Sequence, residues 1–153
     1  MGMLNFGGNK KNKMSVEVHG KGEFDTFCSI TKFSKTQIYA EMKTVLNSNK
    51  NIEDTMDDLV FKLSIISEIQ NCLADIDEFG INNNETVFIP IEGPEEAELM
   101  AEYAGKMFDE LLKEGFTNKN KDVQGTAMNI TYSSTLFGKL SEIAKQNKQT
   151  EIE

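Results

Sequence analysis

The chain has 153 residues, with 16 lysines, no arginine, 25 acidic residues and a formal net charge of −9. This length suits one domain with its own hydrophobic core. Without arginine the chain lacks the bidentate grip on phosphate, carboxylate or guanine that many nucleic-acid-binding proteins use. No apolar run approaches 18 residues and the first residues have no apolar signal-peptide stretch, so we expect neither a transmembrane helix nor export.

The charge is unevenly distributed along the chain. Residues 1–50 hold eight lysines and four acidic residues. Residues 51–114 hold three lysines and 17 acidic residues, and residues 115–153 hold five lysines and four acidic residues. The acidic middle repels nucleic acid and anionic membranes, and it favours encounter with basic partners. The composition, with 14 asparagines and no arginine, is typical of A/T-rich coding sequences such as those of many bacteriophages and mobile elements.

The first segment, residues 1–13, is rich in glycine, asparagine and lysine. This composition predicts a flexible basic arm, in which Lys10, Lys11 and Lys13 are candidates to contact phosphate or an acidic neighbour. We expect residues 14–148 to form a single α+β domain and residues 149–153 to be a frayed C-terminus.

Two apolar runs follow the basic segment. Met14–His19 alternates apolar and polar residues, which predicts a half-buried strand, and Glu23–Phe33 is also rich in β-prone residues. Gly20 to Gly22 separates the runs as a turn, so we predict an N-terminal β-hairpin. The odd-numbered step from Phe24 to Phe27 requires a bulge or a strand that is buried on both faces.

A capping box, Ser34-Lys35-Thr36-Gln37, predicts that a helix begins there. Its buried stripe is expected to comprise Ile38, Met42, Val45 and Leu46. The short polar segment 47–51 then predicts that the next helix packs beside it in an antiparallel direction.

The longest predicted element is a helix from Asn51 to Gly80. Apolar residues recur at three- and four-residue steps, and further apolar side chains, such as Phe61 and Ile65, lie outside that stripe. The apolar surface is therefore wider than one face, so we expect neighbours on two sides. Gly80 can adopt the left-handed conformation that ends a helix.

Both ends of this helix are acidic. Asp54, Asp57 and Asp58 lie in the first two turns, where the helix dipole favours negative charge, whereas Asp75, Asp77 and Glu78 lie in the last turn, where it does not. The last three residues are either solvated surface or a site for a basic partner or a weakly bound divalent cation, and the first three are further candidates to bind a basic partner. The last cluster lacks the spacing and the glycine of an EF-hand loop.

The remaining elements are predicted to be two short strands and two helices. Val87–Ile91 reads as an edge strand because of Pro90, and a helix is expected from Pro94 to Gly115. Residues 127–132 alternate and predict another strand. Ser133 and the next serine can cap a last helix, whose inner face comprises Leu136, Phe137, Leu140, Ile143 and Ala144.

The fold class predicted from these patterns is α+β. It comprises the N-terminal hairpin, the long central helix with two or three further helices, and one or two additional short strands that complete a small, mostly antiparallel sheet.

No constellation of residues indicates catalysis. His19 is the only histidine, and a pair with Cys28 has neither an orienting third group nor an oxyanion-binding device. Cys28 and Cys72 with one histidine cannot complete a structural zinc site without acidic ligands. We therefore expect no enzyme activity, no metal and no cofactor.

Two hypotheses about function remain. The first is a non-enzymatic interaction or assembly subunit, most concretely a virion structural or assembly protein of a bacteriophage or mobile element. The alternative is an acidic inhibitor that imitates nucleic acid and binds a basic surface of another protein. In either case we expect protein partners, including neighbours in a homo-oligomer, and a place in the cytoplasm of a bacterial host or in the virion.

Overall fold

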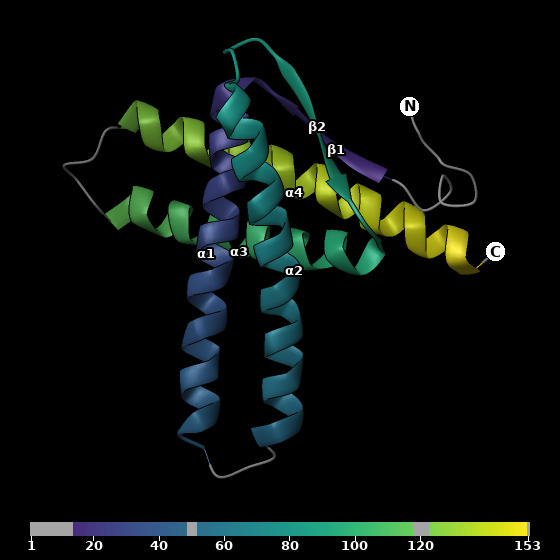
Figure 1. Ribbon diagram of the computed structural model, residues 1–153. Coiled ribbons are helices and arrows are strands. Elements are labelled where there is room, and N and C mark those ends of the chain that lie inside the picture. Colours follow the sequence, from purple (N-terminus) through teal and green to yellow (C-terminus); the bar gives the residue numbers. More distant parts are fainter. Residues whose placement is uncertain (1–13, 49–51, 118–122, 153) are drawn as a thin grey trace.

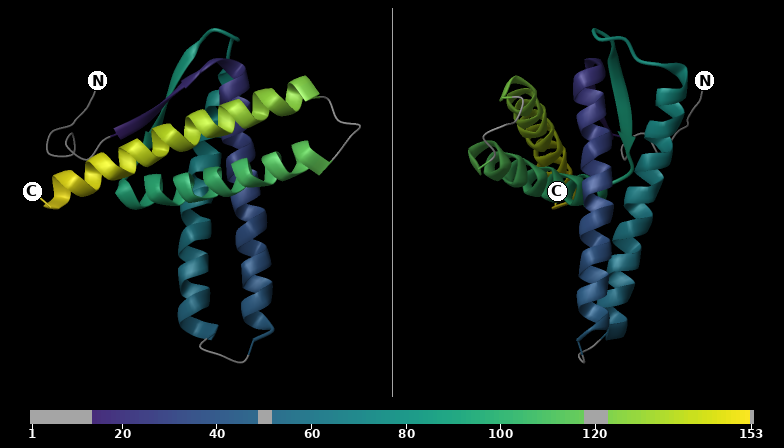
Figure 2. Two further views of the ribbon diagram at one scale, coloured as in Figure 1. Left: turned by 180° about the vertical axis from the view of Figure 1, so that it is seen from behind. Right: turned by 90° about the vertical axis from the view of Figure 1, so that its left-hand side faces the viewer.

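The computed structural model describes residues 14–48, 52–117 and 123–152. The elements in chain order are β1 (Met14–His19), α1 (Gly20–Leu46), α2 (Ile52–Phe79), β2 (Thr86–Ile91), α3 (Pro94–Thr117) and α4 (Val123–Ile152). The α1–α2 hairpin stands upright, and the α3–α4 hairpin crosses it on one side only (Figures 1 and 2). The strands lie near the upper end of α1, whereas the lower halves of α1 and α2 extend beyond the crossing.

The two strands form an antiparallel sheet in which Met14 is opposite Ile91 and His19 is opposite Thr86. Alternate side chains face the same side of a strand, and on that side Val16, Val18, Ile89 and Ile91 are buried. The α+β class and the small antiparallel sheet are thus confirmed, with one strand fewer than the minimum expected. Pro90 lies in a strand with one open edge, as its missing N–H requires.

The predicted N-terminal hairpin is wrong, because Glu23–Phe33 belongs to α1 and β1 pairs with β2 instead. Phe24, Phe27 and Ile30 are all buried. Their three-residue steps, which required a bulge in a strand, fit one face of a helix without any irregularity. The long run of aromatic and branched residues therefore reflects burial rather than strand pairing.

Gly20 makes the sharp change from β1 to α1. Its φ of +80° is in the left-handed region, and a Cβ at this position would collide with the carbonyl oxygen of Asn83. The Gly20 N–H donates a 2.7 Å hydrogen bond to the Glu85 carbonyl oxygen. The chain therefore changes direction at Gly20, but the predicted hairpin turn from Gly20 to Gly22 is wrong, because these residues form the start of α1.

The capping box at Ser34 is also a wrong prediction. Ser34 is buried in the middle of α1, and its hydroxyl donates a 2.7 Å hydrogen bond to the Ile30 carbonyl oxygen. This bond within the helix satisfies the serine, which therefore has no capping role. Of the predicted stripe only Ile38 is fully buried, while Leu46 at the end of the helix is 60% exposed.

The central helix is confirmed as α2, and Gly80 ends it with a φ of +85°. Leu59, Ile66, Ile69 and Leu73 are buried along it. The expectation of cover on two sides is not met along the lower half of the helix, where large apolar side chains stay exposed. The predicted strand at 127–132 lies inside α4.

The apolar face of α4 is formed by Leu136, Leu140 and Ala144, four residues apart and all buried. These residues were correctly assigned to an inner face, whereas Phe137, assigned to the same face, is 42% exposed and Ile143 is only partly buried. The alternation that suggested a strand does not mark a buried face, because Met128 is exposed and Ile130 and Tyr132 are only partly buried.

An ion pair between Glu23 and Lys139 joins three elements. Lys139 Nζ lies 2.6 Å from Glu23 Oε1 and also donates a 2.6 Å hydrogen bond to the carbonyl oxygen of Glu17. The His19 backbone N–H donates to the same Glu23 oxygen at 3.3 Å. The Glu23 side chain is only 9% exposed. The pair therefore connects the start of α1 with α4 and with the end of β1.

Replacing Lys139 with methionine should lower the free energy of unfolding by about 2–4 kcal/mol, because it leaves a buried carboxylate without its cation. Urea denaturation measures this loss. Lys145→Met, an exposed position on the same helix, is the matched control and should change stability by less than about 0.5 kcal/mol. Adding Glu23→Gln to Lys139→Met should recover part of the loss. Equal effects of Lys139→Met and Lys145→Met would contradict this role.

Candidate functional site

The most distinctive surface of the molecule is the projecting end of the α1–α2 hairpin. We call residues 35–48 and 52–65 the arm. Figure 2 shows that α3 and α4 cross one side of the hairpin and leave the opposite side of the arm uncovered. Where the two hairpins meet, the hydroxyl of the buried Tyr103 donates a 3.3 Å hydrogen bond to Glu41 on α1.

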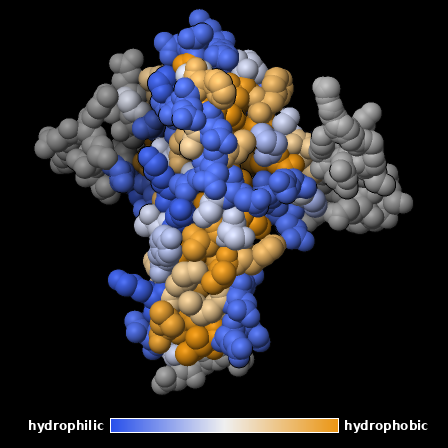
Figure 3. Space-filling model, viewed as in Figure 1, coloured by the Kyte–Doolittle hydropathy of each residue, from blue (hydrophilic) through white to orange (hydrophobic). Residues whose placement is uncertain are grey.

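The arm carries exposed apolar side chains. Tyr39 is 52% exposed, Leu46 60% and Val60 53%. The six residues at 39, 42 and 46 on α1 and at 52, 56 and 60 on α2 follow steps of three and four, so each set shares one face of its helix. We call them the apolar arm face: Tyr39, Met42, Leu46, Ile52, Met56 and Val60. Met42 and Met56 are partly buried against the core, and the other four are exposed. Figure 3 shows hydrophobic side chains gathered on the arm, with hydrophilic side chains beside them.

Phe61 lies outside this face, although it is 54% exposed. It follows Val60 directly and is therefore turned by about 100° around α2. The arm thus exposes apolar side chains in two directions. This exposure agrees with the apolar width of the central helix, which the sequence indicated. The exposed apolar side chains on α1 were not expected, because Leu46 was predicted to be buried.

The predicted acidic partner-binding residues do not form one site. Asp54, Asp57 and Asp58 lie at the arm end of α2, and Asp75, Asp77 and Glu78 lie at its other end; all six are exposed. About 20 residues of helix, or roughly 30 Å, separate the two clusters. Asp58 pairs with Lys62 at 3.4 Å. Lys10, Lys11 and Lys13 lie outside the described residues.

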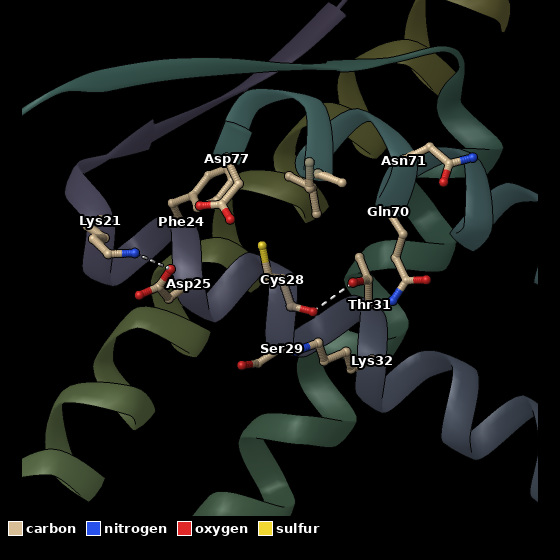
Figure 4. A pocket seen from close by; sticks show the side chains of 12 residues that line it. Lys21, Phe24, Asp25, Cys28, Ser29, Thr31, Lys32, Gln70, Asn71 and Asp77 are labelled. Atoms are coloured by element: carbon tan, nitrogen blue, oxygen red, sulfur yellow. Dashed lines mark hydrogen bonds and ion pairs between the residues drawn. The ribbon is translucent and has the colours of Figure 1, made fainter. Parts of the chain in front are cut away.

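A groove of about 580 Å³ lies between the upper halves of α1 and α2 (Figure 4). Its walls carry both charges, and Lys21 pairs with Asp25 across a 3.2 Å distance. Cys28 points into the groove. Burial raises the pKa of its thiol, and the carboxylates of Asp25 and Asp77 raise it further. The groove therefore holds a protonated thiol at neutral pH, which is a poor nucleophile.

The hypothetical Cys–His pair is not supported by the contacts of His19. Its Nδ1 is 2.9 Å from the Thr86 hydroxyl and its Nε2 is 2.7 Å from a Glu17 carboxylate oxygen.

Burial and nearby carboxylates also raise the pKa of the Cys72 thiol. Among the described residues no three His, Cys, Asp or Glu side chains are grouped closely enough to bind a metal ion.

One titratable side chain, Glu96 near the start of α3, is in an unusual environment. It is buried, and one oxygen accepts a 3.4 Å hydrogen bond from the Glu92 backbone N–H. Burial raises the pKa of this carboxyl group to about 7, and the charges of Glu92 and Glu68 contribute in the same direction. Glu68 is on α2, so the charges that act on the Glu96 carboxyl come from more than one element.

Comparisons with family models, with curated proteins and with solved structures give no significant match for this chain. Over the described ranges, none of the helices is apolar for long enough to cross a bilayer.

Glu96→Gln should make stability less dependent on pH. The folded-state pKa of Glu96, about 7, is above its ordinary value of 4.5, so protonated Glu96 stabilises the fold. That contribution is complete below about pH 4.5 and disappears as pH rises through 7. The glutamine variant should therefore be more stable than the wild type at pH 8, by about 1–3 kcal/mol, and similar at pH 4.5.

Urea denaturation at both pH values measures the difference, with the exposed neighbour Glu95→Gln as control. Parallel stability profiles for the wild type and Glu96→Gln would show that the Glu96 carboxyl is not perturbed by its surroundings.

Proposed function

We propose that this chain is a non-enzymatic protein–protein interaction or assembly subunit that docks through the apolar arm face. The observation that carries the proposal is the exposure of Tyr39, Leu46 and Val60 together on a projecting two-helix arm. Isolated apolar residues on a surface are ordinary, but contiguous patches of several hundred Å² usually mark interaction sites.

The shape of the molecule supports this use of the arm. The α3–α4 hairpin and the sheet pack near the upper end of the α1–α2 hairpin, where most of the buried core lies. Below the crossing the two arm helices bury side chains mainly against each other. Two helices cannot cover both sides of their own apolar surfaces, so a further surface is needed to remove the apolar arm face from water.

The form we propose for this subunit is a virion structural or assembly protein of a bacteriophage or mobile element. The lysine- and asparagine-rich composition without arginine supports that choice. A projecting docking element also suits a chain that must join neighbours in an assembly. No step of this proposal requires a cofactor, a metal or a catalytic residue.

The alternative function is an acidic inhibitor that occupies a nucleic-acid-binding surface on another protein. It is supported by the 17 acidic residues and three lysines of residues 51–114. The six candidate acids are exposed, but they lie in two separate clusters rather than in one continuous row. Reversing the charges of Asp54, Asp57, Asp58, Asp75 and Asp77 should abolish such binding, and raised salt should weaken it.

The proposal is tested by Val60→Asp, which places a charge in the apolar arm face without disturbing the buried core. Light scattering after gel filtration should show the wild type, alone or in lysate of its host, in complexes above 17.2 kDa. The variant should remain a folded monomer, because a buried unpaired carboxylate opposes association.

Phe79→Asp is the matched control, since Phe79 is 92% exposed at the opposite end of the same helix. It should associate like the wild type. A wild-type chain that stays monomeric under both conditions, or complexes that are unaffected by Val60→Asp, would contradict the proposed role of the arm.

A further inference from the structure

We infer that the occupant of the apolar arm face is the arm of a second copy of this chain, and that the two arms form a four-helix bundle. This inference rests on the proposed interaction function and names the partner. Antiparallel helical hairpins commonly bury their apolar faces by pairing into four-helix bundles, and identical chains do so most often about a twofold axis.

The size of the arm suits this pairing. Each arm helix contributes roughly 12 residues, or about 18 Å, and two helices side by side are about 20 Å wide. One face therefore covers on the order of 400 Å² in projection, and side-chain relief makes its accessible area larger. Two copies bury about 1,000 Å² or slightly more, which is near the lower bound for a specific interface. We accordingly expect dissociation constants in the micromolar range.

The charges beside the apolar arm face are complementary between its two edges. On α1, Lys43 lies one turn from both Tyr39 and Leu46; on α2, Asp57 lies one turn from Val60. Glu53, one turn before Asp57, continues the acidic edge on α2, and Lys35 lies one turn before Tyr39 at the end of the α1 set. All four carry charged groups that form no ion pair within the described parts of their own chain. The arm thus has a basic edge on α1 and an acidic edge on α2.

A dimer with its twofold axis parallel to the arm brings the basic edge of each copy next to the acidic edge of the other. It places α1 of one copy opposite α2 of the other, with both tips at the same end and each helix antiparallel to its new neighbour. Since α1 ends at Leu46 and α2 begins at Ile52, Lys43 of each copy then lies level with the first turns of the opposite α2, where Glu53 and Asp57 are found. Both edges are paired at once, which selects this arrangement over the one with opposed tips.

The purified full-length chain provides the first test. Sedimentation velocity over a range of concentrations around 10 µM should show a reversible dimer of twice the 17.2 kDa chain mass. Val60→Asp should raise the dissociation constant at least tenfold, whereas Phe79→Asp should leave it unchanged. Circular dichroism should give the same helix content for all three proteins.

A charge exchange tests the arrangement itself. Lys43→Glu and Asp57→Lys should each weaken self-association about tenfold, because each places like charges opposite one another at two symmetric positions. An equimolar mixture of the two variants should recover the dimer. In the mixed pair the two introduced side chains face each other at one contact, and the native Lys43 and Asp57 face each other at the other, so both contacts are attractive. High salt should reduce the differences.

The outcomes separate this inference from the proposed function. A chain that remains monomeric to several hundred micromolar overturns the inference, and it leaves the proposed function standing if Val60→Asp still abolishes a complex in lysate. A wild-type dimer that Val60→Asp does not affect overturns both. A Val60-dependent dimer whose two charge variants do not recover on mixing overturns the parallel twofold arrangement.

Discussion

The arrangement of this molecule depends on the buried carboxylate of Glu23. It receives the ammonium group of Lys139 from α4 and the backbone N–H of His19 at the end of β1, while Lys139 also holds the Glu17 carbonyl oxygen. A buried carboxylate without these partners would be strongly destabilising. Its interactions therefore connect α4 and the end of β1 to the first turn of α1.

That junction lies at one end of a 27-residue helix. The strands and the second hairpin are gathered around it, so the other end of α1 extends beyond their cover together with the start of α2. The exposed apolar arm face follows from this asymmetry. A long helical hairpin that is anchored near one end leaves the apolar side chains of its other end exposed. The basic edge on α1 and the acidic edge on α2 are complementary, which favours a second arm as the partner that covers them.

Sequence patterns were most informative where the apolar residues followed one clear spacing and residues typical of helix ends marked the limits of the element. This explains why α2 and the start of α3 at Pro94 were predicted closely and why β2 was recognised from its branched residues. They failed for Glu23–Phe33, where β-prone residues occupy a buried helical face, since tertiary contacts override intrinsic preference. The Glu23–Lys139 pair joins residues 116 positions apart, and no local pattern could have indicated it.

The candidate site was only partly predictable. The acidic residues were chosen as candidates because the sequence contains so many of them, but the structure places them in two separate clusters along α2. Leu46 and Val60 belong to ordinary amphipathic stripes, and their exposure depends on which side and which end of the hairpin α3 and α4 cover, which the local sequence does not specify. The excess apolar width of the central helix was the one indication that its cover was incomplete.

Amide hydrogen exchange of the full chain at two protein concentrations, one well below and one well above 10 µM, tests the central claim most directly. Exchange reports local opening residue by residue. Pairing of the arms predicts that amides of residues 39–46 and 52–61 exchange more slowly at the higher concentration, while those of α3 and α4 do not change. Arm exchange that is the same at both concentrations would contradict the account.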